Sequence, residues 1–71
     1  MFRLKELRIS RKISQTKLAM DLNLTQNSIS RYETGEREAD YDTLVAIADY
    51  FNVSVDYLLG RTDNPKIAGN S

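Results

Sequence analysis

Start and stop signals for helices recur at short intervals along this chain, and they constrain its fold more than any other feature. Small polar residues of the kind that cap a helix N-terminus stand at four positions: Ser14, Thr25, Asp40 and Ser54. Residues that readily adopt a left-handed backbone, and so end a helix, follow each of them: Asn23, Gly35, Asn52 and Gly60. No segment alternates between apolar and polar residues as a strand does. The sequence therefore predicts an all-α fold built from short helices.

Five helical segments are expected, at about residues 3–11, 15–22, 26–34, 41–51 and 55–59. In the fourth, apolar residues recur at the spacing of a buried helical stripe: Leu44, Ile47, Ala48 and Phe51. The final stretch, RTDNPKIAGNS, has no such periodicity. We therefore expect one domain at residues 1–60, followed by a flexible C-terminal tail at residues 61–71.

Composition excludes several classes of function. A chain of 71 residues accommodates one small domain and leaves no room for a second catalytic or sensor domain. Cysteine and histidine are both absent, which removes disulfides, thiolate metal sites, the usual general base and the commonest metal ligand. We therefore expect no metal, no cofactor and no enzymatic activity. The N-terminal MFRLKELRIS has no apolar signal core, and no long uncharged stretch suggests a membrane segment, so a cytoplasmic protein is predicted.

The net charge of zero conceals a strong asymmetry between the two halves of the chain. Residues 1–34 carry seven basic and three acidic side chains, whereas residues 35–71 carry three basic and seven acidic ones. Such a distribution favours a protein with one side turned towards a polyanion and an acidic side behind it. The alternative is a chance segregation of solvated surface charges.

The third helical segment has almost no apolar surface to bury. From Thr25 onwards, only Ile29 and Tyr32 can form an inward stripe. The remaining positions carry amide, hydroxyl and guanidinium groups, which suit recognition of a partner better than packing. An amide can pair with adenine through two hydrogen bonds and an arginine with guanine, so these side chains favour reading of DNA bases.

Two blocks of sequence support this interpretation. SQTKLAMDLNLTQNSISRYETGE, followed by TLVAIADYFNVSVDYLLG, resembles the Cro/phage-repressor helix-turn-helix family, also called Xre-like. The resemblance extends from Leu4 to Gly60. It implies a compact five-helix, lambda-repressor-like DNA-binding domain whose third helix enters the major groove. The chain departs from the family pattern at Asn23 in place of the turn glycine, at Lys17 in place of a capping-box Glu, and in an acidic loop, residues 36–40, that lacks proline.

The resemblance and the helical spacing together select the candidate site residues. Base readout is predicted for four residues that share one face of the third helix: Gln26, Asn27, Ser30 and Arg31. Contacts with DNA phosphates are predicted for six others: Gln15, Lys17, Thr25, Ser28, Lys12 and Arg37. Gln15 has the alternative of a solvated first-turn residue. Arg11 and Lys12 either contact phosphates or complement the C-terminal end of the first helix.

Arg8 and Glu33 lie among apolar neighbours in the sequence, and similar proteins pair the residues at these positions. We therefore expect a structural ion pair that ties the first helix to the end of the third. A pair of this kind adds little net stability, but removal of one partner would strand a charge and cost about 3–5 kcal/mol.

These observations predict a sequence-specific regulator that binds double-stranded DNA, most simply a repressor encoded by a bacterium or phage and associated with the nucleoid. An antitoxin that represses its own operon is the alternative. A weak homodimer through Asn52 to Leu59, on a near-palindromic operator, is expected because one helix reads too few base pairs for useful specificity. Alternatively, Leu58 closes the core and the rest of that segment is ordinary exposed surface.

Overall fold

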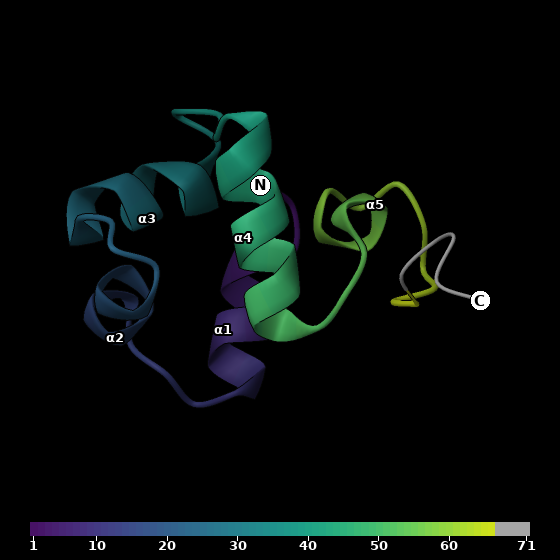
Figure 1. The fold of residues 1–71 in the computed structure, drawn as a ribbon, viewed down its shortest axis with the longest axis horizontal. Helices are drawn as coiled ribbons and strands as arrows, with labels where there is room; N and C mark the ends of the chain where they lie inside the picture. Colours follow the sequence, from purple (N-terminus) through teal and green to yellow (C-terminus); the bar gives the residue numbers. More distant parts are fainter. Residues whose placement is uncertain (67–71) are drawn as a thin grey trace.

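The computed structural model describes residues 1–66, and within this range the chain forms five helices and no strand. They are α1 (Leu4–Ser10), α2 (Gln15–Asp21), α3 (Gln26–Thr34), α4 (Tyr41–Phe51) and α5 (Val55–Leu58). Helices α2 and α3 lie on one side of α1 and α4, and α5 lies on the other (Figure 1). The predicted all-α, five-helix architecture is confirmed. None of the described helices is long and apolar enough to cross a membrane.

All four predicted N-caps are present. In each case the capping side chain accepts a hydrogen bond from the backbone N–H three residues later: Ser14 from Lys17, Thr25 from Ser28, Asp40 from Thr43 and Ser54 from Tyr57. Because the first N–H groups of a helix have no partner within it, these bonds determine where each helix begins.

The predicted stop residues also adopt the left-handed conformation. Their φ angles are 58° at Asn23, 80° at Gly35, 57° at Asn52 and 77° at Gly60. The first helix ends within one residue of the predicted position, but the left-handed conformation of Lys12, with a φ of 58°, was not anticipated, because lysine is not a typical left-handed residue. There the Lys12 N–H donates to the carbonyl of Ile9 at 2.9 Å, and that of Ile13 donates to the carbonyl of Arg8 at 3.2 Å.

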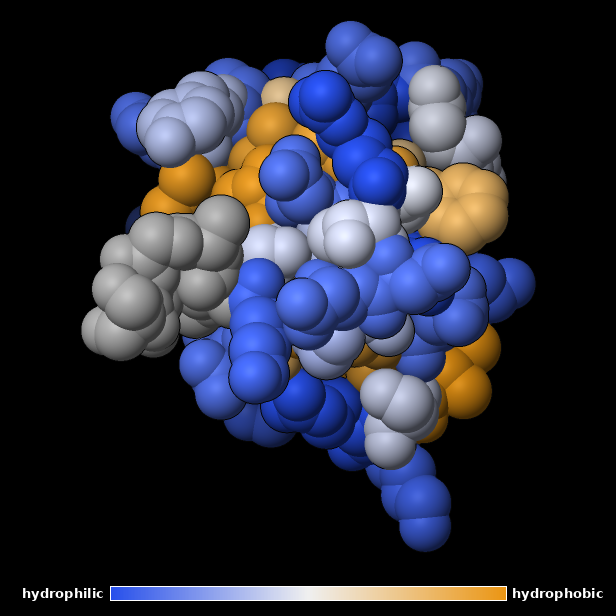
Figure 2. Space-filling view, turned by 90° about the vertical axis from the view of Figure 1, so that its right-hand side faces the viewer, coloured by the Kyte–Doolittle hydropathy of each residue, from blue (hydrophilic) through white to orange (hydrophobic). Residues whose placement is uncertain are grey.

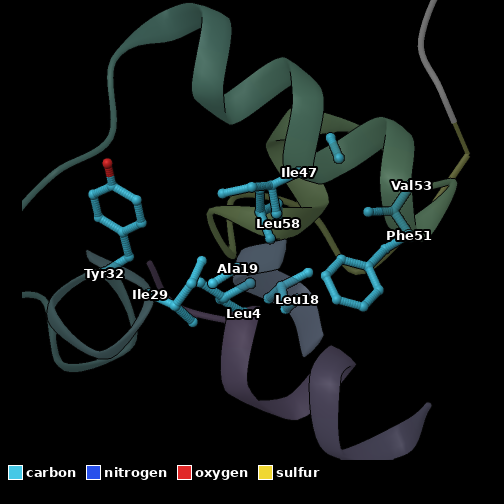
Figure 3. Packing of buried hydrophobic residues seen from close by; sticks show 10 residues of the cluster. Leu4, Leu18, Ala19, Ile29, Tyr32, Ile47, Phe51, Val53 and Leu58 are labelled. Carbon is cyan, nitrogen blue, oxygen red and sulfur yellow. The ribbon is translucent and has the colours of Figure 1, made fainter. Parts of the chain in front are cut away.

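The core draws side chains from every helix. Six of them are fully buried: Leu4, Leu18, Ile29, Ile47, Phe51 and Leu58. Leu58 and Ile47 point towards Leu4 and Leu18 from the opposite side of the core, with Phe51 beside them (Figure 3). The fold therefore depends on convergence of all five short helices, since none of them buries a large surface alone.

Helices α2 and α3 meet at a tight elbow. Ala19 is 3% exposed, and its small side chain allows the two helices to approach closely. Its carbonyl accepts a hydrogen bond from the backbone N–H of Leu24 at 2.8 Å, across the left-handed Asn23. The elbow positions α3 with Ile29 in the core and its opposite side turned outwards.

The described part of the predicted tail, residues 61–66, contacts the body of the domain. The carbonyl of Pro65 accepts a hydrogen bond from the Ser54 N–H at 3.0 Å. The Arg3 guanidinium lies 2.7 Å from the Asp63 carboxylate and stacks 4.3 Å from the centre of the Tyr57 ring. The rest of the tail, residues 67–71, lies outside the described residues, and its predicted flexibility stays a prediction.

Candidate nucleic-acid interface

Helix α3 has one buried side and one polar side. Ile29 is fully buried and Tyr32 is 4% exposed, as the sequence predicted. Gln26, Asn27 and Arg31 are exposed, while Ser30 is half-buried next to them. The four predicted base-reading residues therefore lie on the outer side of α3, where amide, hydroxyl and guanidinium groups can reach another molecule.

A chain of side-chain hydrogen bonds connects this outer side with the start of α2. The Gln26 Nε2 donates to Gln15 Oε1 at 3.2 Å, and the Gln15 Nε2 donates to Glu33 Oε1 at 3.0 Å. Sequence reasoning assigned Gln15, Gln26 and Glu33 three separate roles and missed that they are connected. The spacing of Gln26 and Glu33 offered one signal of this connection, because residues seven apart lie on the same side of a helix after two turns.

Glu33 also forms the expected ion pair with Arg8. The Arg8 Nε lies 2.6 Å from Glu33 Oε2, and its Nη2 donates to Glu33 Oε1 at 3.3 Å. The third nitrogen of the Arg8 guanidinium, Nη1, donates to the carbonyl of Ile13 at 2.9 Å. The two side chains are only 13% and 4% exposed, so the pair joins α1 to α3 in a largely desolvated position.

Lys17, a predicted phosphate contact, is engaged within the protein. Its ammonium lies 2.9 Å from the Asp21 carboxylate, which also accepts a hydrogen bond from the Tyr50 hydroxyl at 2.6 Å. The hydrogen bonds from Tyr50 and Lys17 hold the pKa of Asp21 below its ordinary value, and the bond to Asp21 raises the pKa values of Lys17 and Tyr50. Lys17 is thus protonated at neutral pH, and a phosphate would have to compete with Asp21 for it.

The remaining predicted phosphate contacts lie at the start of α3 and in two loops. The Thr25 hydroxyl accepts from the Ser28 N–H at 3.1 Å and donates to the Ser28 hydroxyl at 2.9 Å. Lys12 is exposed in its left-handed turn, and Arg37 is exposed with its guanidinium 5.9 Å from the centre of the Tyr32 ring. Thr25 and Ser28 therefore lie together at the start of α3, whereas Lys12 and Arg37 belong to the loops after α1 and α3.

Arg11 has a role that neither of the two interpretations from sequence included. Its guanidinium donates to the carbonyl of Phe51 at 2.8 Å and lies 5.6 Å from the centre of the Phe51 ring. Arg11 thereby complements the C-terminal end of α4, where the last carbonyls have no partner in the helix. Because Phe51 is forty residues away in sequence, nothing in the local pattern indicates this contact.

The described residues include no group of three or more acidic side chains that could hold a metal ion. The polar side of α3 and the start of α2 are connected by the hydrogen bonds of Gln15, which link Gln26 to Glu33. This arrangement can bind a partner that presents hydrogen-bonding edges between negative charges.

Comparison with known proteins agrees with this geometry. A family model described as helix-turn-helix matches residues 4–58. The HTH-type transcriptional regulator ImmR of Bacillus subtilis is 42% identical over 64 residues, which cover 90% of this chain and 50% of the relative. The uncharacterised HTH-type transcriptional regulator YqaE of the same organism is 41% identical over 64 residues, covering 90% of this chain and 55% of the relative.

A third relative, the HTH-type transcriptional activator BcrR of Enterococcus faecalis, is 32% identical over 57 residues, covering 80% of this chain and 28% of the relative. The chain spans about half the length of ImmR and YqaE. No solved structure shows significant similarity to it.

Proposed function

The chain belongs to the helix-turn-helix family, and from this premise we propose that it is a sequence-specific, DNA-binding transcriptional repressor without enzymatic activity. One observation carries the proposal: α3 buries Ile29 and Tyr32 and turns amide and guanidinium side chains outwards. An α-helix fits the major groove, where each base pair presents its own pattern of donors and acceptors. The names of ImmR and YqaE, both transcriptional regulators, support the same class of function. No observation among the described residues favours the antitoxin alternative.

We assign base readout to Gln26, Asn27, Ser30 and Arg31. Gln26 and Asn27 occupy the first turn of α3, the part of a recognition helix that reaches base edges most directly. Amides pair best with adenine and the guanidinium of Arg31 with guanine, and each good pair discriminates by about 1–3 kcal/mol.

Phosphate contacts are assigned to residues around the recognition helix: Gln15, Lys17, Thr25, Ser28, Lys12 and Arg37. Gln15 stands at the first position of α2, where backbone N–H groups favour an anion. In the loop that follows α3, Arg37 is the only base among the acids Glu36, Glu38 and Asp40, and Asp40 is occupied as the cap of α4. We therefore expect this loop to contribute little attraction to DNA beyond Arg37.

Two copies are proposed to bind a near-palindromic operator as a weak dimer through Asn52 to Leu59. Leu58 is fully buried and Val53 is 6% exposed, so both belong to the core. Val55, Tyr57 and Leu59 remain half-buried, and a shallow groove runs between α4 and the start of α5. On the side shown in Figure 2, an apolar area at the upper left and others at the right are bordered by hydrophilic residues. A surface of this kind supports a contact that forms on DNA rather than a strong dimer in solution.

The test of readout begins with enrichment of random duplex DNA on the purified protein. The selected and a random duplex are then titrated with Arg31→Ala and with Lys17→Ala at several salt concentrations. Arg31→Ala should weaken binding of the selected duplex by about 1–3 kcal/mol and leave binding of the random duplex unchanged. Lys17→Ala should weaken binding of both duplexes. It should also reduce the steepness of the plot of log binding constant against log salt concentration by about 1. Equal losses on both duplexes for both variants would contradict the assignment of α3 as the reading helix.

Sedimentation tests the dimer. A palindromic duplex and a single half-site are each mixed with saturating protein, and two copies per palindrome but one per half-site are expected. One protein per full palindrome at saturation would exclude the proposed dimer.

A further inference from the structure

We propose that Glu33, which need not touch DNA, determines which purine the reading helix prefers, because it sets the direction of the hydrogen bonds from Gln15 to Gln26. The inference rests on the proposed function and concerns one base position within it. Glu33 acts here as a positioning residue, through two amides that connect it with the outer side of α3.

The donor-to-acceptor direction of these two hydrogen bonds follows from the chemistry of Glu33. An amide group carries a donor and an acceptor and can be turned either way, whereas a carboxylate only accepts hydrogen bonds. Glu33 Oε1 therefore obliges Gln15 to turn its Nε2 inwards, at 3.0 Å. Gln15 Oε1 then faces Gln26, which must in turn offer its own Nε2, at 3.2 Å.

This direction determines which hydrogen-bond donors and acceptors of Gln26 remain free to contact a base. One hydrogen of its Nε2 is used by Gln15, and its Oε1 accepts no hydrogen bond within the described part of the chain. One donor and one acceptor remain. They complement adenine, which presents N7 as an acceptor and its N6 amino group as a donor in the major groove. Guanine presents two acceptors, N7 and O6, and would leave Oε1 facing a carbonyl.

The opposite direction would remove the preference. If Gln15 turned its Nε2 towards Gln26, the Gln26 Oε1 would accept that bond with one of its two lone pairs, and both hydrogens of the Gln26 Nε2 would be free. Two free donors match guanine, while the second lone pair and one hydrogen still match adenine. A single acceptor-only residue at the inner end of the chain thus produces the preference for adenine.

Glu33 is well held for this purpose. Its side chain is 4% exposed, and the Arg8 Nε binds its other oxygen, Oε2, at 2.6 Å. Arg8 is itself anchored on the carbonyl of Ile13. The ion pair therefore keeps the carboxylate in place beside Gln15.

The experiment compares base preference in matched variants by enrichment of random duplex DNA. Gln26→Ala first identifies the base position that Gln26 reads, as the position whose preference disappears. At that position we expect the unmodified protein to prefer adenine over guanine by about tenfold, as one good amide pair allows. Glu33→Gln admits both directions of the chain, and the preference should fall to within about twofold of parity.

Arg8→Lys is the matched control. Lysine can still pair with Glu33 through one ammonium group but loses the two-point contact of the guanidinium, so the thermal midpoint should fall. The carboxylate at position 33 remains, so the adenine preference should persist. Gln15→Met leaves the ion pair intact and interrupts the chain, so it should lose the preference even if Glu33→Gln is too unstable to assay. An unchanged preference in Gln15→Met, or an equal loss in Arg8→Lys, would overturn the inference. If the unmodified protein enriches no sequence, the proposed function itself fails.

Discussion

Helices α3 and α4 are built from the same local signals and serve different ends. Each begins at a side-chain cap and ends at a left-handed residue. Over nine residues, α3 buries Ile29 and Tyr32 and leaves a polar side without acidic groups, apart from the enclosed Glu33. Over eleven residues, α4 buries three residues, Ile47, Ala48 and Phe51, and exposes Asp42 and Asp49. Helix α4 therefore mainly stabilises the domain, whereas the outer side of α3 is available for recognition.

The largest expected effect comes from the buried side of α4. Phe51 is fully buried, and Phe51→Ala should destabilise the fold by about 4 kcal/mol through lost burial and an unfilled cavity. A small domain with a total stability of roughly 3–5 kcal/mol would then be largely unfolded at 25 °C. Circular dichroism during thermal melting measures this. Ile47→Val, which should cost about 1 kcal/mol, is the control that should still fold. A folded Phe51→Ala would show that α4 contributes less to stability than its buried residues indicate.

The next effect tests whether α3 is anchored by the ion pair. Arg8→Ala strands the largely buried Glu33 carboxylate and should cost about 3 kcal/mol of stability. Urea unfolding with and without the change provides the free energy difference. The opposite result, an unchanged unfolding midpoint with loss of DNA binding, would make Arg8 a phosphate contact instead.

A smaller effect on a different property is expected from the outer side of α3. Asn27→Ala should weaken the selected DNA duplex by about 1–3 kcal/mol, while the free energy of unfolding changes by no more than about 0.5 kcal/mol. Titration of DNA and thermal melting of the same preparation measure both quantities. Ala46→Ser, on the exposed side of α4, should alter neither greatly. A large loss of stability in Asn27→Ala would show that the outer side of α3 also stabilises the fold.

The smallest effect concerns the contact between α4 and the end of α2. The hydrogen bond from Tyr50 is the largest cause that lowers the pKa of Asp21 from its ordinary 3.8. A lowered pKa means that the contribution of Asp21 to stability is present above about pH 3.8 and is lost as the pH falls through the lower folded value. Tyr50→Phe should raise the Asp21 pKa towards 3.8, as measured by NMR titration of the carboxyl carbon. An unchanged value would show that Lys17 alone maintains the shift.

The positions of the helices follow from local signals in the sequence. The caps at Ser14, Thr25, Asp40 and Ser54 and the stops at Asn23, Gly35, Asn52 and Gly60 act through bonds and backbone angles within a few residues. For that reason the predicted segments agree with the observed helices to within about a residue at most ends. The left-handed conformation of Lys12, just after α1, was not predicted, because lysine has no clear local signature for it.

The sequence also determined which side of α3 faces the core, since Ile29 and Tyr32 are its only apolar residues. The resemblance to a known family indicated the Arg8–Glu33 pair, but not what else Glu33 holds. The proposed roles of the individual polar residues towards DNA remain predictions until binding is measured.

Which distant groups meet depends on how the helices pack together. Arg11 bonds the carbonyl of Phe51, Tyr50 bonds Asp21, and Gln15 connects Glu33 to Gln26. Each of these contacts joins two helices, and it exists only because packing of the shared core fixes their relative positions. Helix limits are set by short-range hydrogen bonds that a sequence pattern displays, whereas long side chains choose partners only after the backbone has brought those partners within reach.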